Sequence, residues 1–146
     1  APFGPFEIIR ARQVVECELA AMAAAQADPH TLAGLQEALA LMRADMAGGR
    51  APVQGDRLFH LRIAEAADNG PLLRTVTALY DERNTPLFEQ LGQHVETLPT
   101  WQDALHEHQA VLDAITRGDP AAARGAMHRH LQQSHDRLAG LLPAAA

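Results

Sequence analysis

Proline recurs along the chain at fairly even intervals, and each recurrence opens a stretch in which apolar residues follow a helical period. The prolines at these starts are Pro5, Pro29, Pro52, Pro71, Pro99 and Pro120. Proline fits the first turn of a helix, because the N–H group that it lacks would be unpaired there anyway. The pattern predicts six helices, which span residues 5–27, 29–47, 52–68, 70–95, 99–117 and 119–142. We expect Pro86, inside the fourth of these, to kink or break the helix.

Residues that cap helices stand next to these prolines. Asp28, Asn69 and Asp119 precede predicted helices, and their side-chain oxygens are suited to accept hydrogen bonds from the first turn. Thr100 with Asp103 resembles a capping box. No stretch shows the alternation of a strand, and β-branched residues are sparse while alanine is abundant. Because the connections are short, the sequence predicts an all-α fold in which sequential helices pack as an antiparallel bundle.

Size and composition exclude several classes of protein. A chain of 146 residues is one ordinary domain, and 47% hydrophobic with 21% charged residues is typical of a globular protein. The single cysteine, Cys17, excludes a disulfide framework, and we interpret it as a buried apolar filler. No apolar run approaches the ~20 residues that span a bilayer, so no membrane partner is expected. With a net charge of −6 the chain alone is expected to bind nucleic acid poorly.

Histidine is the informative residue type, because the helical period separates two kinds of position. In the fifth predicted helix His108 lies on the apolar stripe, whereas His106 faces the other way. In the sixth, His130 lies on the apolar stripe and His128 does not. His108 and His130 also lie at nearly equal depth, since at about 1.5 Å per residue both are roughly 15–17 Å from the turn between the helices. In an antiparallel hairpin they should face each other, as two ligands of one metal must.

The third predicted helix adds Asp56 and His60, which are one turn apart and share a face with apolar residues. A carboxylate and an imidazole on an inward stripe are costly to bury unless both are satisfied. Each of these residues alone can be a hydrogen-bonded core group. Taken together with His108 and His130, they predict one divalent metal ion held by an N/O ligand set, which suits Zn, Ni, Mn or Fe.

Two arginines also occupy apolar positions. Arg12 lies on the stripe of the first predicted helix, where it can extend outward, pair with Glu16, or aim its planar fork at a ligand carboxylate. Arg83 lies on a similar stripe near Pro86, so it can either be an ordinary helix-face residue or point toward a ligand. We predict both as ligand-binding residues.

Several catalytic motifs are missing from the sequence. There is no H-E-x-x-H pattern, no glycine-rich phosphate loop and no nucleophile elbow. Cys17 has no catalytic partner that the sequence reveals, and no general base is left over beside the predicted metal. These absences favour a binding domain. A small helical metalloenzyme that uses the same Asp/His site to activate water stays open as the alternative, and so does a helical dimerisation module without a ligand.

Short motifs in a fixed order run through nearly the whole chain. They are Arg12-x-x-x-Glu16, Asp56-x-x-Phe59-His60, Asn69, Glu107-His108, Ala114-Ile115, Gly118-Asp119 and Ala122-x-x-x-Ala126-Met127-x-x-His130-Leu131. This combination resembles the FCD domain, the ligand-binding C-terminal domain in the FadR branch of GntR-type bacterial transcription regulators. Each motif is weak alone, but their order and spacing together are fairly specific.

The resemblance carries implications of its own. It implies an all-α antiparallel bundle of six or seven helices, in which Asp56, His60, His108 and His130 hold the metal. It also implies a small organic acid as effector, which completes the metal's coordination. It places Arg12 and Asn69 near that pocket. It also implies no catalysis.

The domain organisation follows from the same resemblance. Residues 1–146 would form one effector-binding and dimerisation domain of a homodimeric cytoplasmic regulator. An N-terminal winged helix-turn-helix that binds DNA is absent from this chain, so DNA would be a partner only through that separate domain.

Overall fold

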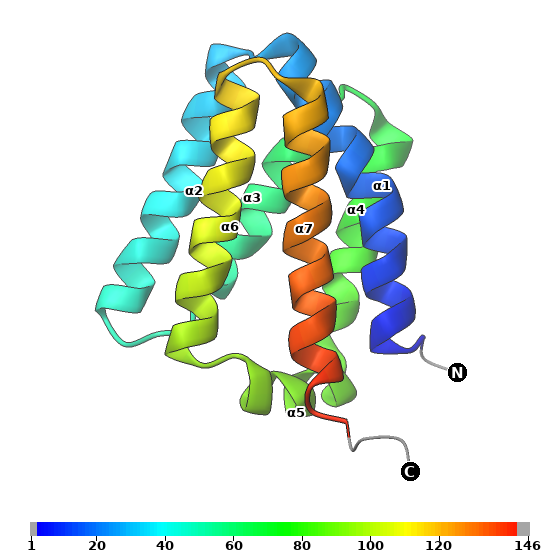
Figure 1. The fold of residues 1–146 in the computed structure, drawn as a ribbon, viewed down its shortest axis with the longest axis vertical. Helices are drawn as coiled ribbons and strands as arrows, with labels where there is room; N and C mark the ends of the chain where they lie inside the picture. The colour runs from blue at the N-terminus through cyan, green and yellow to red at the C-terminus, as the bar shows by residue number, and fades with distance from the viewer. Residues whose placement is uncertain (1–2, 143–146) are drawn as a thin grey trace.

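The computed structural model describes residues 3–142, and within that range the chain forms seven α-helices and one 3-10 helix (Figure 1). The helices are α1 (Pro5–Gln26), α2 (Pro29–Ala47), α3 (Val53–Glu65), α4 (Gly70–Asp81), η1 (Glu82–Asn84), α5 (Pro86–Val95), α6 (Leu98–Thr116) and α7 (Pro120–Ala139). No strand occurs in the described range, so the predicted all-α class is confirmed. No helix of this range is long and apolar enough to span a bilayer.

Three helices begin where the capping residues predict. The side chains of Asp28, Asn69 and Asp119 each accept a backbone hydrogen bond from the third residue beyond, at 3.0–3.3 Å. Each cap is followed by proline in the first helical turn, where no N–H partner is needed. Sequence and structure therefore agree on these starts for a local reason.

Several bounds differ from the sequence prediction. The third predicted helix, 52–68, is shorter, because α3 begins at Val53, with Pro52 as its N-cap, and ends at Glu65. The fourth predicted helix breaks: α4 ends at Asp81, η1 follows, and the hydroxyl of Thr85 caps α5 at Pro86. The break at Pro86 was one of the two expected outcomes. At α6, Thr97 rather than Thr100 is the N-cap, because the helix begins before Pro99 and Thr100 becomes the third helical residue of the capping box.

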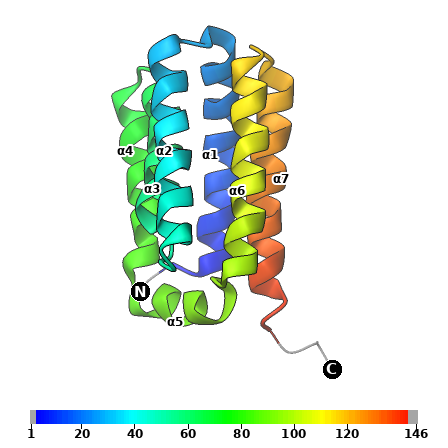
Figure 2. The same cartoon turned by 90° about the vertical axis from the view of Figure 1, so that its left-hand side faces the viewer.

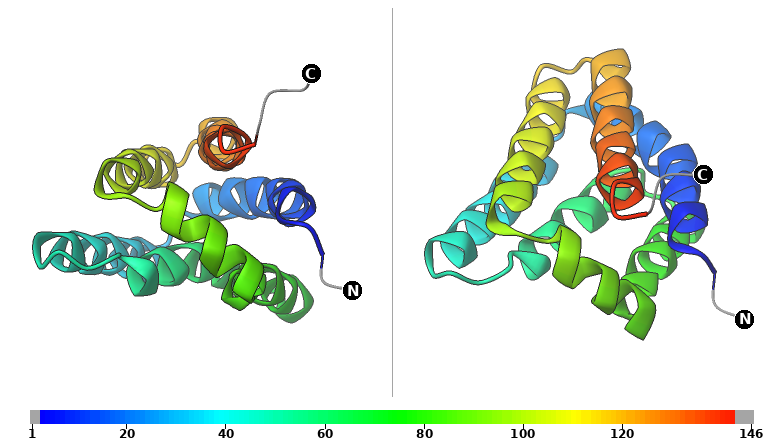
Figure 3. Two further views of the ribbon diagram at one scale, coloured as in Figure 1. Left: turned by 90° about the horizontal axis from the view of Figure 1, so that it is seen from below. Right: turned by 60° about the horizontal axis from the view of Figure 1, so that its bottom comes forward.

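The helices pack as an elongated bundle whose lower end is crossed by α5 (Figures 2 and 3). Helices α6 and α7 form an antiparallel hairpin, with α1 beside α7 and α2 beside α6. Helix α3 packs on α2, and α4 packs on α3 and α1. The largest fully buried apolar side chains come from α1, α2, α3, α6 and α7, and they are Leu19, Leu35, Leu39, Met42, Phe59, Ile63, Ile115, Met127 and Leu131.

Helices α2 and α3 approach each other closely at Gly55. A Cβ atom at this position would lie 2.6 Å from the carbonyl oxygen of Ala38 and 2.9 Å from the backbone nitrogen of Met42. Only glycine allows such an approach without moving a backbone. Because Asp56 follows directly, this contact also fixes the position of the carboxylate that the sequence predicts as a metal ligand.

Candidate metal centre

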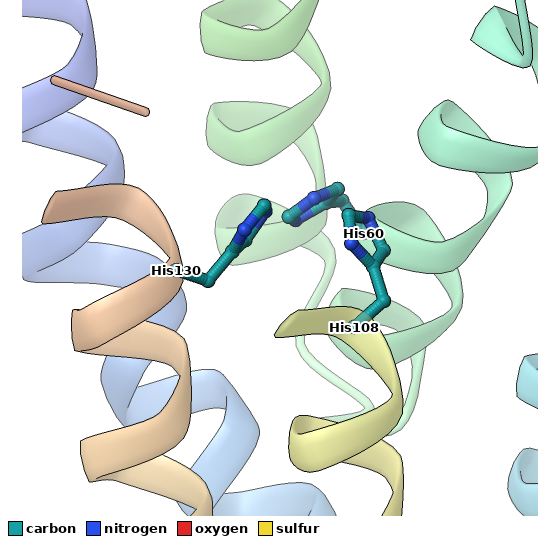
Figure 4. A group of neighbouring side chains, drawn as sticks. All are labelled: His60, His108 and His130. Carbon is teal, nitrogen blue, oxygen red and sulfur yellow. The ribbon is translucent and has the colours of Figure 1, made fainter. Parts of the chain in front are cut away.

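Three imidazoles from three helices point toward one another in the interior of the bundle (Figure 4). His60 comes from α3, His108 from α6 and His130 from α7, and they are 1%, 0% and 4% exposed. One nitrogen of each ring lies within 4.8 Å of the corresponding atoms of the other two. The ring centroids of His108 and His130 are 4.5 Å apart, which confirms that these residues face each other at one level.

Hydrogen bonds to Nδ1 fix the orientation of the first two rings. The Nδ1 atom of His60 is 2.5 Å from Oε1 of Glu16, and that of His108 is 2.5 Å from the carbonyl oxygen of Ala104. A carboxylate and a carbonyl have no hydrogen to give, so each Nδ1 is the donor. The lone pair of each neutral ring is therefore on Nε2. The Nε2 atom of His60 is buried and has no hydrogen-bond partner, which is unusual for a buried polar atom.

The third ring is held in the same way from the opposite side. The Nδ1 atom of His130 donates to Oε1 of Glu107 at 2.6 Å. Arg137 in turn donates to both oxygens of Glu107, at 2.9 and 3.0 Å. Imidazoles that bind metals commonly donate their second N–H to a carboxylate or carbonyl, which fixes the tautomer and the ring plane. All three histidines have this arrangement.

Asp56 lies beside the imidazoles, with each carboxylate oxygen in a different environment. Its Oδ1 atom is 2.8 Å from Nε2 of His108 and 3.6 Å from Nε2 of His60. Its Oδ2 atom accepts hydrogen bonds from the Tyr80 hydroxyl and from Nη1 of Arg83, the latter at 2.8 Å. With the proton of His108 on Nδ1, two electron-rich atoms face each other at 2.8 Å. That approach is favourable only with a proton or another cation between them.

The electrostatics of the cluster favour the metal-binding forms of His130 and Asp56, whereas His60 is held closer to its protonated form. Burial and the neighbouring imidazoles lower the pKa of His130 to about 3, so this ring is neutral at physiological pH. Burial opposes ionisation of Asp56, but the neighbouring imidazoles of His108 and His60 outweigh it and hold its pKa well below the usual value. Burial likewise opposes protonation of His60, but Glu16 and Asp56 beside it outweigh burial and raise its pKa.

This donor set fits a divalent metal. Three imidazole nitrogens and one carboxylate oxygen suit first-row ions such as zinc, nickel, manganese or iron. The orphaned Nε2 atom of His60 and the close approach of Asp56 to His108 are both relieved by a cation. The residues that would hold it are those predicted from the sequence: Asp56, His60, His108 and His130.

A cavity of about 520 Å³ extends from the cluster toward α5, which lies across that end of the bundle. It is lined from every helix except α2, and His60 and His130 are part of its wall. Trp101, the single tryptophan of the chain, also lines it. A cavity of this size accommodates a small-molecule ligand.

Arg12 pairs with Glu16, which is one of the three arrangements that its sequence position allows. Its Nε atom donates to Oε2 of Glu16 at 2.7 Å, and its guanidinium lies over the Tyr80 ring at 5.1 Å from the centroid. Burial would raise the pKa of Glu16, but the charges of Arg12 and His60 outweigh it and lower that pKa to about 2. Arg12 thus supports the carboxylate that orients His60, and it also lines the cavity.

The other two predicted ligand-binding residues have different outcomes. Arg83 lies at the cavity, where Nη1 donates to Asp56 and Nη2 to Glu96. Asn69 does not belong to the cavity wall; its side chain caps α4 by accepting from the backbone of Leu72 at 3.0 Å. Helix capping therefore accounts for an asparagine at this position, which the family resemblance had placed near the pocket.

Cys17 is confirmed as a buried packing residue. Burial, together with the charges of Glu16 and Glu18, raises the pKa of its thiol to about 11. A thiol in that state is inert, because the thiolate is the reactive form.

The described chain is thus an antiparallel helical bundle with a buried histidine cluster beside a cavity. The model of the FCD domain matches residues 7–133, so the chain belongs to the FCD domain family, as the sequence motifs predict. The Uxu operon transcriptional regulator of Escherichia coli K12 is 34% identical over 138 residues, covering 92% of this chain and 54% of that protein. The putative L-lactate dehydrogenase operon regulatory protein of the same strain is 35% identical over 133 residues, covering 89% and 50%.

The chain spans about half the length of the curated relatives it matches. Among solved structures, E. coli McbR/YncC superposes with a TM-score of 0.77 at 24% identity, over 92% of this chain and 63% of that one. At that identity the likeness concerns the fold alone. The relatives are named as transcriptional regulators, which favours a regulatory domain over an enzyme.

Proposed function

We propose that the chain is the effector-sensing domain of a transcription regulator. It binds one divalent metal through Asp56, His60, His108 and His130, and a small organic acid in the adjoining cavity. The observation that carries this proposal is that every Nδ1 atom of the three imidazoles is held by an acceptor, which leaves the Nε2 lone pairs for one ion. The regulator names of the relatives support the sensing role.

The carboxylates nearest the imidazoles support a sensor rather than a metalloenzyme. Glu16 is bound to both Arg12 and His60, and Glu107 to both His130 and Arg137. A general base must be able to take a proton from bound water, and these two carboxylates are committed to orienting imidazoles. A metal at this site would instead supply coordination positions for an effector carboxylate. The remaining Nη groups of Arg12, which lines the cavity, are suited to a second effector oxygen.

The wider regulator is part of the proposal. DNA would be bound by a separate N-terminal winged helix-turn-helix domain, since a chain with net charge −6 is poorly suited to phosphate contacts. We propose a cytoplasmic homodimer, because two-fold symmetric regulators read two-fold symmetric operators.

The test of the metal site is elemental analysis of protein purified at neutral pH without chelators, followed by calorimetric titration of Zn²⁺ into the metal-free protein. We expect one ion per chain. A chain that retains no metal, and that binds Zn²⁺ no better than a variant in which His60, His108 and His130 are all replaced, would contradict the proposal.

Acid is expected to release the metal. An imidazole binds metal only when neutral, so protons compete as the pH falls through the imidazole range near ~6.5 and below. The raised pKa of His60 makes this ring take up a proton at a higher pH than His130, whose pKa is lowered. Equilibrium dialysis at pH 7.5, 6, 5 and 4 measures retention. Unchanged metal content at pH 4 would contradict histidine ligation.

Replacing Glu107 by glutamine should weaken metal binding by about 10- to 100-fold, the usual effect of losing a partner of a ligating imidazole. The substitution removes the charge that holds Nδ1 of His130, yet it keeps the size of a half-buried side chain. The matched control is Glu37→Gln on the exposed face of α2. Calorimetry with Zn²⁺ compares the two variants, and equal affinities would show that Glu107 does not orient His130.

Replacing Arg12 by alanine should weaken effector binding by roughly 10- to 150-fold, which is the loss of one charge-assisted hydrogen bond. The metal should stay bound, because Glu16 keeps His60 as a partner. Arg74→Ala, at an exposed position of α4, is the control. A thermal-shift series with lactate, gluconate, galacturonate and citrate identifies an acid that binds, and the fluorescence of Trp101 then reports its affinity. If Arg12→Ala binds that acid as tightly as wild type, Arg12 is not an effector contact.

A further inference from the structure

The cavity beside the histidine cluster is rich in arginine, but each arginine is already paired with a carboxylate of the chain. The arginines in its wall are Arg12, Arg57, Arg83 and Arg137. Arg57 donates to both oxygens of Asp81, at 2.9 and 3.1 Å. A site for a highly charged anion would contain arginines that are not paired with carboxylates of the protein. This cavity differs from such a site.

The three arginines nearest the cluster follow the same rule. Arg137 grips both oxygens of Glu107, and Arg12 donates to Glu16 through Nε. The remaining one, Arg83, bridges two carboxylates, since Nη1 donates to Asp56 and Nη2 to Glu96.

Acidic groups outnumber the arginines in this part of the described chain. Four acidic residues line the cavity: Asp56, Asp81, Glu89 and Glu96. Two more, Glu16 and Glu107, lie outside its wall and pair with Arg12 and Arg137. Four positive side chains thus face six negative ones. A divalent ion held by the cluster would offset this excess of two negative charges, and it would then be the main attraction for an anion.

We propose that this cavity selects acids that carry a single carboxylate, bound at the metal end, with an uncharged remainder directed toward α5. This inference rests on the proposed function and specifies its ligand class. A second carboxylate would have to separate an existing ion pair or lie unpaired beside Glu89 and Glu96. Both are unfavourable, because a charge removed from water needs a partner and like charges at close range repel.

The far part of the cavity is suited to an uncharged remainder. Phe88 and Leu91 of α5 face it together with Trp101 of α6, and the neutral polar side chains of Gln93 and Ser134 also belong to the wall. Aliphatic carbon and hydroxyl groups both find contacts there. A carboxylate would meet no unpaired arginine among the residues that the structure describes in this wall.

The test compares acids matched in size that differ by one charge. Gluconate is compared with glucarate, and butanoate with succinate, by calorimetry and by Trp101 fluorescence on the Zn²⁺-loaded protein. We expect the monoacid of at least one pair to bind, and its diacid to bind about tenfold more weakly or worse. A diacid that binds as tightly as its monoacid, or more tightly, overturns the inference while leaving the proposed function intact. Failure of every acid, with the metal bound, overturns both.

A charge variant tests the cause of the selectivity. Glu96→Gln removes one acidic group and frees part of Arg83, so it should strengthen diacid binding relative to the monoacid by about threefold or more. The control is Glu37→Gln, because Glu37 is exposed on α2, a helix that does not line the cavity. It should leave the ratio of monoacid to diacid affinity unchanged. An unchanged ratio in Glu96→Gln would show that the charges of the wall do not set the selectivity.

Discussion

Replacing His108 by alanine is expected to abolish measurable metal binding and, with it, binding of the effector. The loss should exceed the about 10- to 100-fold typical of a lost partner of a metal ligand, because here a ligand itself is removed. Wild type at a metal concentration of about 100 times Kd gains about 2.7 kcal/mol of stability. The variant should lose that gain, so that Zn²⁺ no longer raises its melting temperature.

The matched control is His106→Ala, since His106 stands two residues away on the exposed face of the same helix. It should bind metal as wild type does. Because His108 is fully buried and packs against Phe59, its loss also destabilises the metal-free protein. His108→Leu, which fills more of the space without offering a ligand, separates the two effects. If either His108 variant retained one ion per chain at wild-type affinity, His108 would not be a ligand.

The inward positions of the four proposed ligand residues could be predicted from the sequence because they follow from helix geometry. A helical period decides which side of a helix a residue faces, and equal distances from one turn decide that His108 and His130 meet. Both facts depend only on residues that are close together in the sequence. Asp56 and His60 share a face by the same rule, and α3 brings that face against the hairpin of α6 and α7.

The partners of those ligands could not be predicted in the same way. Glu107 precedes His108 in the sequence, yet it binds His130 on the next helix, because adjacent residues of a helix point in different directions. Glu16 is visible as a partner of Arg12, but its contact with His60 depends on how α1 crosses α3. Tyr80 lies one turn before Arg83, and this spacing is a signal that could have connected both to Asp56.

The fourth predicted helix illustrates a different limit. Pro86 signals an interruption, but the sequence does not say whether the chain bends or breaks. The Thr85 hydroxyl caps a new helix, so the chain breaks and α5 turns across the end of the bundle. That turn, which places α5 over the cavity, is a property of tertiary packing.

The second large effect is expected at Gly55, where alanine should destabilise the fold. Helix propensity alone would favour alanine by about 1 kcal/mol. The new Cβ, however, would lie 2.6 Å from the Ala38 carbonyl oxygen and 2.9 Å from the Met42 nitrogen. Backbone atoms cannot rotate away, so α2 and α3 must move apart, and overpacking of this kind typically costs about 1–3 kcal/mol or more. We expect the clash to dominate and the melting temperature to fall by about 2–4 °C for each kcal/mol.

Gly70→Ala provides the matched control, because a Cβ atom there would meet no atom within 4 Å and the residue also lies in the first turn of a helix. Alanine at that position should be neutral or slightly stabilising. Since Asp56 follows Gly55, separation of α2 from α3 should also shift the carboxylate and weaken binding of Zn²⁺, whereas Gly70→Ala should leave the affinity unchanged. Thermal unfolding of the metal-free variants and calorimetry with Zn²⁺ measure the two effects. A Gly55→Ala protein as stable as wild type would mean that the two helices can separate at little cost, and the close approach would then not be what positions Asp56.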